Sequence, residues 1–245
     1  MKPYNILLAI TGLMLIIPIC STAQEGEVYV SLAAGVSIPV SDYAASDFCQ
    51  ERSGFAMPGA NFSINFGYRL NEYVSLTGLL SGSVNRYNYI KLQDWFTENK
   101  SEEFPDKRWL VESKNWGLGG LMLGATGSLP LVTNKLFVEA RALGGFTYVY
   151  SPELKITGME DGEEDLFMRI DQYSALSWAL DFGAGFRYKR TRKQYFTIYA
   201  DYLMAHPNYE NVKVLDNDIG IIREESFSQK VNTVNITFGL GYIID

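Results

Sequence analysis

The residues best suited to chemistry are few in this chain of 245 residues, which has one histidine and two cysteines. A hydrolase or acyltransferase needs its histidine beside a nucleophile in an ordered site. The alternation of the surrounding segment instead turns His206 outward, next to Pro207. No spacing of His and Cys along the sequence suits a metal ion. We therefore predict a protein that is not an enzyme, with no catalytic residue, no cofactor and no metal site.

Six charged residues are more informative, because all of them lie on the polar face of segments in which apolar and polar residues alternate. They are Arg69, Glu139, Arg141, Asp181, Arg187 and Asp201. Counted from the short turns, Glu139 and Arg187 fall at similar heights, and so do Arg141 and Asp201. Buried charges are costly unless they are paired. We expect an ionic and hydrogen-bonded plug inside the fold, which would serve stability or, alternatively, act as a gate.

Aromatic and acidic residues mark two of the longer connecting segments. Four aromatic residues stand among mixed charges, namely Trp95, Phe96, Phe104 and Trp109. Exposed aromatic residues in such surroundings suit recognition of a protein partner, although they could instead fold back on the rim. The acidic run from Glu160 to Asp165 lacks the ordered spacing of a calcium loop, so a solvated tip is the simpler interpretation. The net charge of −7 argues against a nucleic-acid partner.

Along the segments that must position these residues, apolar and polar side chains alternate with period two, which is the side-chain period of a β-strand. The clearest is the last, where bulky apolar residues alternate with small or polar ones: Val234, Ile236, Phe238, Leu240 and Tyr242. The same period predicts eight strands, at about 27–38, 59–70, 73–87, 112–129, 135–150, 172–189, 195–206 and 232–245. The fourth is the least regular, because its glycines blur the parity and suggest a bulge.

The connections between these strands are short and long in turn, and the long ones span about 15 to 25 residues. This pattern predicts an all-β fold, an eight-stranded antiparallel up-and-down transmembrane β-barrel with short periplasmic turns and long extracellular loops. A soluble lipocalin-like barrel would show the same period with its faces exchanged. The polar face here is rich in Gly, Ser, Asn and Thr, which suits a narrow lumen filled by side chains and favours the membrane barrel.

The N-terminal residues predict export from the cytoplasm. Lys2 precedes an apolar run from Ile6 to Ile19, and Ser21-Thr22-Ala23 supplies small residues for cleavage. We predict a cleaved signal peptide over residues 1–23 and one outer-membrane β-barrel domain over residues 24–245. Lipoprotein processing at Cys20 is the alternative, but the residue before it is not small.

In this pattern the chain resembles outer-membrane β-barrels of the OmpA-membrane-domain and OmpX type. It resembles more closely the porin-like or PorT-like eight-stranded barrels of Bacteroidetes-type bacteria. Their barrel-assembly signal is similar to Thr237, Gly239, Tyr242 and Ile244, except that this chain ends in Ile-Asp instead of an aromatic residue. The resemblance implies the bacterial outer membrane, with contacts to its lipid and lipopolysaccharide and to the barrel-assembly machinery.

Several functions remain open from the sequence. The first is a monomer with a structural or surface-interaction role, a filled lumen and an extracellular or envelope protein partner. The resemblance also allows an accessory barrel of an envelope assembly or protein-secretion system. A narrow channel comes next, and an outer-membrane enzyme is the last alternative.

Overall fold

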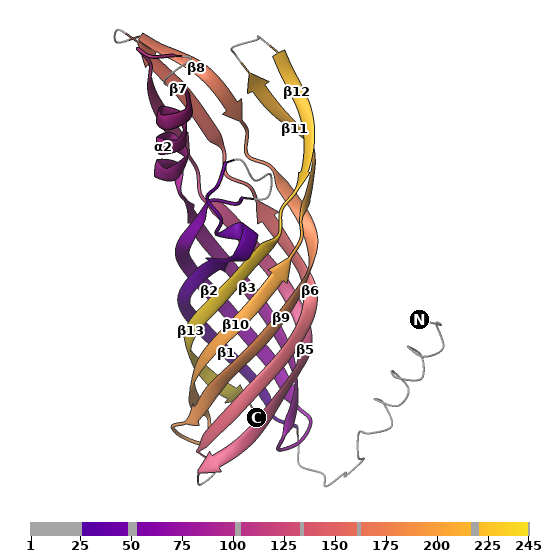
Figure 1. The fold of residues 1–245 in the computed structure, drawn as a ribbon. Helices are drawn as coiled ribbons and strands as arrows, with labels where there is room; N and C mark the ends of the chain where they lie inside the picture. The colour runs from indigo at the N-terminus through magenta and orange to yellow at the C-terminus, as the bar shows by residue number, and fades with distance from the viewer. Residues whose placement is uncertain are drawn as a thin grey trace, which may run out of the picture.

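The computed structural model describes residues 26–48, 53–100, 104–132, 135–160, 163–216 and 221–244, which form a closed barrel with a second sheet above it (Figure 1). The barrel strands are β1 (Val28–Val40), β2 (Ala56–Arg69), β3 (Val74–Tyr87), β5 (Trp116–Val132), β6 (Leu136–Tyr150), β9 (Ser174–Lys189), β10 (Gln194–Ala205) and β13 (Val231–Ile244). They are antiparallel and close in the order β1-β13-β10-β9-β6-β5-β3-β2. The predicted eight-stranded barrel is confirmed. The expected signal peptide and Cys49 lie outside the described residues.

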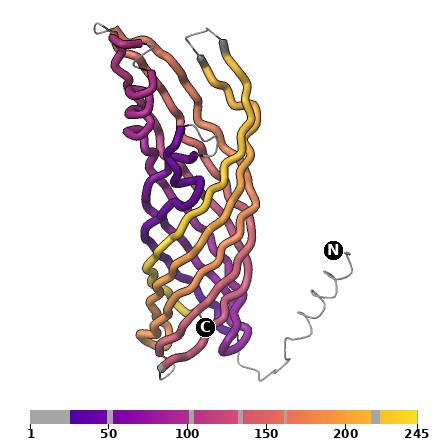
Figure 2. Tube along the Cα trace, in the orientation of Figure 1, coloured from indigo at the N-terminus to yellow at the C-terminus, as the bar shows by residue number. Residues whose placement is uncertain are grey.

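The barrel closes between the first and last strands, which run side by side in Figure 2. Their pairing extends from Val28 opposite Ile244 to Val40 opposite Asn232. A path across the sheet from position 40 of β1, followed pair by pair through the other seven strands, returns to β1 at position 30. This stagger of ten residues tilts the strands, and eight tilted strands leave an interior that side chains can fill.

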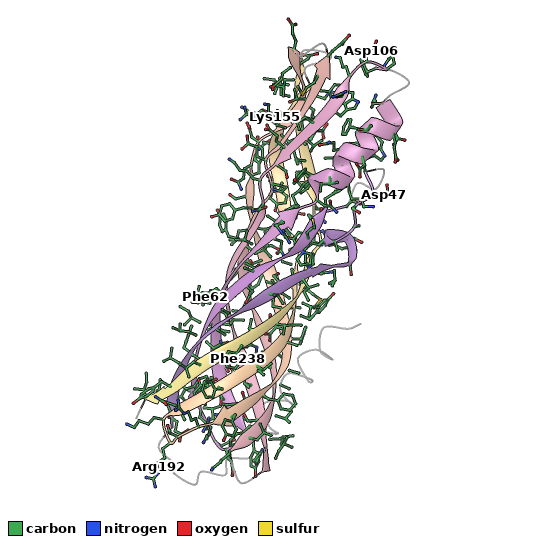
Figure 3. All side chains as sticks on the ribbon, turned by 90° about the vertical axis from the view of Figure 1, so that its left-hand side faces the viewer. Asp47, Phe62, Asp106, Lys155, Arg192 and Phe238 are labelled. Atoms are coloured by element: carbon green, nitrogen blue, oxygen red, sulfur yellow. The ribbon has the colours of Figure 1, made fainter. Side chains whose placement is uncertain are left out.

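The outer wall of the barrel is apolar, and Phe62 and Phe238 project from it in Figure 3. Their exposed fractions are 52% and 57%, and the neighbouring strands contribute exposed Leu, Val and Phe in the same way. Tyr68 and Tyr242 stand near the short-turn end of this belt, whereas Trp178 stands near the other end. An apolar band between aromatic girdles, on a barrel without an open edge, is the form in which β-strands cross a bacterial outer membrane.

The long connections form a second, five-stranded sheet in the order β12-β11-β8-β7-β4, which the period-two pattern did not predict. Its strands are β4 (Arg108–Ser113), β7 (Leu154–Glu160), β8 (Glu163–Ile170), β11 (Asn208–Asp216) and β12 (Ile221–Ser228). Helix α2 (Tyr89–Lys100) packs on β4, and a 3-10 turn η1 (Ser41–Tyr43) follows β1. Within the described residues, no helix has the length and apolar character to span a membrane.

The predicted fourth strand needs correction at its start and at its expected bulge. It was expected to begin near Glu112, but residues 108–113 form β4 of the upper sheet and the barrel strand begins at Trp116. Its glycines do not form a bulge, because β5 pairs with β3 without interruption from Trp116 to Gly127. The one shift in the pairing of β5 with β6 lies between Pro130 and Val132. Proline has no N–H to donate to a ladder, which explains an irregularity there.

Candidate functional site

The lower lumen holds a cluster around Glu139. Strand β6 pairs with β9 so that Phe137 faces Arg187, which places Glu139 diagonally across from the arginine. Arg187 Nε lies 2.8 Å from Glu139 Oε1 but does not direct its N–H at that oxygen, so the contact is an ion pair without a linear hydrogen bond. Glu139 accepts hydrogen bonds from Ser128 Oγ at 2.7 Å and from the hydroxyl of Tyr199. The two charged side chains are only 5% and 6% exposed.

The upper lumen holds a second cluster around Arg141. Its Nε donates to Asp201 Oδ1 at 2.7 Å, and its Nη1 donates to Asn65 Oδ1 at 2.6 Å. Asp181 Oδ1 lies farther away, 3.9 Å from the same Nε. The guanidinium carbon is 4.3 Å from the centre of the Tyr199 ring, so this tyrosine links the two clusters. Arg141, Asp181 and Asp201 are all buried.

Arg69, the sixth of the predicted lumen charges, joins neither cluster. It pairs with Glu27 near the short-turn end, where the glutamate is partly exposed. The structure thus brings together Glu139 with Arg187 and Arg141 with both aspartates, whereas Arg69 pairs with Glu27 and only borders the same small cavity as Glu139 and Arg187. Counting charges missed the neutral partners Asn65, Ser128 and Tyr199, although their inward parity would have revealed them.

Aromatic side chains close the upper end of the lumen. Tyr43 meets Trp116 with ring centroids 5.3 Å apart, and Phe55 stacks on Tyr87 at 5.6 Å. The indole of Trp116 donates to the carbonyl of Gly54 at 2.8 Å, which fastens the β1–β2 connection over the mouth. All four aromatic residues are buried. Burial raises the pKa of Tyr43 well above its usual value.

Two small cavities lie on either side of Arg141. The lower one, of about 20 Å³, is bordered by Glu139, Arg187 and Tyr199. The upper one, of about 10 Å³, is bordered by both aspartates of the Arg141 cluster. A buried water needs a cavity of about 10–15 Å³, so each cavity has room for about one water-sized molecule or ion.

The aromatic residues proposed for loop recognition occupy a different environment from the expected one. Phe96 and Trp109 are 2% and 5% exposed, because they pack with Phe167 in the core of the upper sheet. Trp95 and Phe104 lie against the same core and are partly buried. The hypothesis of an exposed aromatic surface is therefore wrong for Phe96 and Trp109. Their burial stabilises the upper sheet instead.

The remaining predicted residues lie on the barrel wall. Thr237 and Gly239 face inward, whereas Tyr242 and Ile244 face outward with 44% and 48% exposure. His206 is exposed just beyond the upper end of β10, and its backbone N–H donates to Ser177 Oγ. Among the described residues, no group of three or more His, Cys, Asp or Glu is arranged to hold a metal ion.

No protein-family model matches the chain, and no curated protein matches it in sequence. Among solved structures it is similar to the attachment invasion locus protein Ail of Yersinia pestis, with 15% identity over 90% of this chain and 100% of that one and a TM-score of 0.44. Neisserial surface protein A gives 12% identity over 89% and 99%, with a TM-score of 0.44. A major outer membrane protein of Thermus thermophilus gives 10% identity over 90% and 100%, with a TM-score of 0.48. With its closed strand order and apolar wall, the chain is an eight-stranded β-barrel of the bacterial outer-membrane type.

Proposed function

We propose that this barrel is a non-catalytic surface-interaction protein that presents its upper sheet to an extended segment of an extracellular or envelope protein. The observation that carries the proposal is that a helix covers one edge of that sheet and not the other. The edge strand β4 is covered by α2, whose Gln93 side chain accepts a hydrogen bond from the backbone of Val111. The other edge strand, β12, packs chiefly against its neighbour β11.

The exposure of β12 suits binding by strand addition. All the side chains from Ile222 to Ser228 are exposed. An edge strand offers a row of backbone donors and acceptors to which an extended peptide can add as a further strand. Glu224 and Glu225 place charge on this edge, which discourages indiscriminate pairing between copies of the chain. The filled lumen supports the same proposal, because clusters around Glu139 and Arg141 leave no wide channel for transport.

Site-specific photo-crosslinking on cells that produce the protein and its native partners tests this proposal. A photo-reactive side chain at Ile222 of β12 should give one discrete protein adduct. The same group at Ile90 of α2 is the matched control, because the two residues are 62% and 58% exposed. Two single variants, Glu224→Pro and Glu225→Pro, test whether a backbone N–H of β12 binds the partner. Adjacent residues of a strand direct their N–H groups to opposite sides, so one of the two prolines should abolish the adduct while leaving the pairing with β11 intact.

The outcomes separate the proposed function from its main alternative. The absence of an adduct at Ile222, or an equal adduct at Ile90, would refute recognition through β12. An adduct formed only from the short-turn end, for example at Arg192, would favour an accessory barrel of an envelope assembly or secretion system, as the PorT-like resemblance allows. Arg192 stands at that end, remote from the upper sheet, in Figure 3.

A further inference from the structure

The charges of the upper lumen do not balance. Arg141 supplies one positive charge, whereas Asp181 and Asp201 supply two negative charges, and all three side chains are 2–4% exposed. Elsewhere in the lumen each carboxylate has a cationic partner, because Arg187 pairs with Glu139 and Arg69 pairs with Glu27. With both aspartates ionised, one buried negative charge remains beside Arg141. An uncompensated buried charge is strongly unfavourable, so a compensating positive charge is expected at this point.

Two oxygen atoms show where that positive charge would be. Asp181 Oδ1 and Asn235 Oδ1 are buried and accept no hydrogen bond from the residues that the structure describes. The two residues are 1% and 7% exposed. Arg141 does not satisfy Asp181, because its N–H groups are directed to Asp201 and Asn65.

The strand register brings these groups to one place. Asn235 of β13 faces Asp201 of β10, and Leu203 of β10 faces Asp181 of β9. Three adjacent strands thus present one amide and two carboxylate groups to the same part of the lumen. All three residues border the cavity of about 10 Å³, which is also lined by Arg141 and by Asn61, Ser63 and Ser81. Apart from Arg141, each of these polar side chains offers an oxygen ligand.

We propose that this cavity binds one monovalent cation of about the size of Na⁺, with Asp181 Oδ1 and Asn235 Oδ1 as ligands. Oxygen donors of this kind are the ligands that hard cations prefer. A single positive charge neutralises the excess, whereas a divalent ion would reverse it. The cavity has room for one ion without its hydration shell. A water molecule would fit the same space but would leave the buried charge uncompensated.

Unfolding of the full chain in detergent micelles tests the site, with sodium chloride compared against choline chloride at the same pH and ionic strength. Choline is too large for the cavity, so only sodium should stabilise the barrel. For one site, each tenfold increase in Na⁺ above its dissociation constant should raise the folding equilibrium constant tenfold. Asp181→Asn should abolish this response. Glu139→Gln is the matched control, because it removes a carboxylate from the lower cluster and should retain the response.

Crystals soaked in thallium(I) provide a second readout that does not depend on the stability of any variant. An anomalous peak beside Asp181 and Asn235 would support the cation site. Equal stability of the wild-type protein in sodium and choline would overturn the proposal, and so would an equal sodium response in Asp181→Asn. Stability that varies with pH but not with sodium would also overturn it, because a proton would then neutralise the aspartates.

Discussion

Replacement of Glu139 by glutamine gives the most direct test of the lower ionic cluster. The substitution keeps the shape of the side chain and removes its charge, so Arg187 loses the anion that lies 2.8 Å from its Nε. The pair is nearly fully buried, and Glu139 also accepts hydrogen bonds from Ser128 and Tyr199. Removing one partner of a buried pair costs about 3–5 kcal/mol, because the other charge stays buried. Since the amide can still accept one hydrogen bond, we expect a loss of about 3 kcal/mol.

Reversible unfolding in urea measures this loss, with the migration of unboiled samples on gels as the readout for the folded barrel. Arg187→Gln and the double variant complete a thermodynamic cycle. If the pair is the cause, the double variant should be more stable than the sum of the single losses by about 2 kcal/mol, within the range for coupled neighbours. Glu27→Gln is the exposed control. Glu27 pairs with Arg69 but is 41% exposed, so its loss should cost less than about 1 kcal/mol.

Two results would refute this reasoning. One is an unchanged urea midpoint for Glu139→Gln, which would mean that the pair contributes nothing to stability. The other is simple additivity of the single variants within about 0.5 kcal/mol, because independent sites add in this way. In either case the closeness of the two charges in the lumen would not stabilise the barrel.

Three further predictions concern other parts of the molecule. Trp109→Ala should destabilise the upper sheet by about 3–5 kcal/mol, as for other buried tryptophans, and make it sensitive to proteases while the barrel still migrates as a folded species. Gly183→Ala should lower the free energy of unfolding by about 1–3 kcal/mol in urea, because its Cβ would collide with Asp201 Oδ1. Burial raises the pKa of Tyr43 in the folded state, so its contribution to stability is fully present below the unfolded pKa of about 10 and is lost as the pH rises through the folded value. Tyr43→Phe should therefore unfold less readily above pH of about 10 than the wild type, and equal alkaline sensitivity would contradict this assignment.

The barrel could be predicted from the sequence because each of its strands lies between two different environments. Lipid on one side and a narrow polar lumen on the other impose a strict period of two, which the closing strand shows from Val234 to Tyr242. The same period places the inward charges, and the short turns set their heights. The proximity of Glu139 to Arg187 therefore follows from parity and counting alone.

The upper sheet could not be predicted in the same way. Its strands have only six to nine residues, and bulges in the β7–β8 and β11–β12 pairings interrupt the period of two, so their pattern is weaker than that of the barrel strands. Helix α2 buries only Leu92 and Phe96 among many charged residues, and a short helix depends on such packing for its stability. The folding of this sheet decides which aromatic residues of the long connections are buried. For that reason the sequence left open whether Phe96 and Trp109 form a binding surface or fold back, and it did not reveal the core in which they lie.

The pairing of β1 with β13 has a kinetic consequence. The final ladder joins residues near opposite ends of the chain, Val28 with Ile244, so the last step of folding must close a very large loop. Such non-local contacts form late and slowly, because the chain loses the entropy of loop closure before the new contacts stabilise the fold. Until then the sheet has two open edges, each with the full length of a membrane-spanning strand and the same tendency to pair with another chain. Every partly assembled sheet of this protein, up to the one in which seven seams are made and the eighth is open, therefore keeps two edges that can pair with another chain.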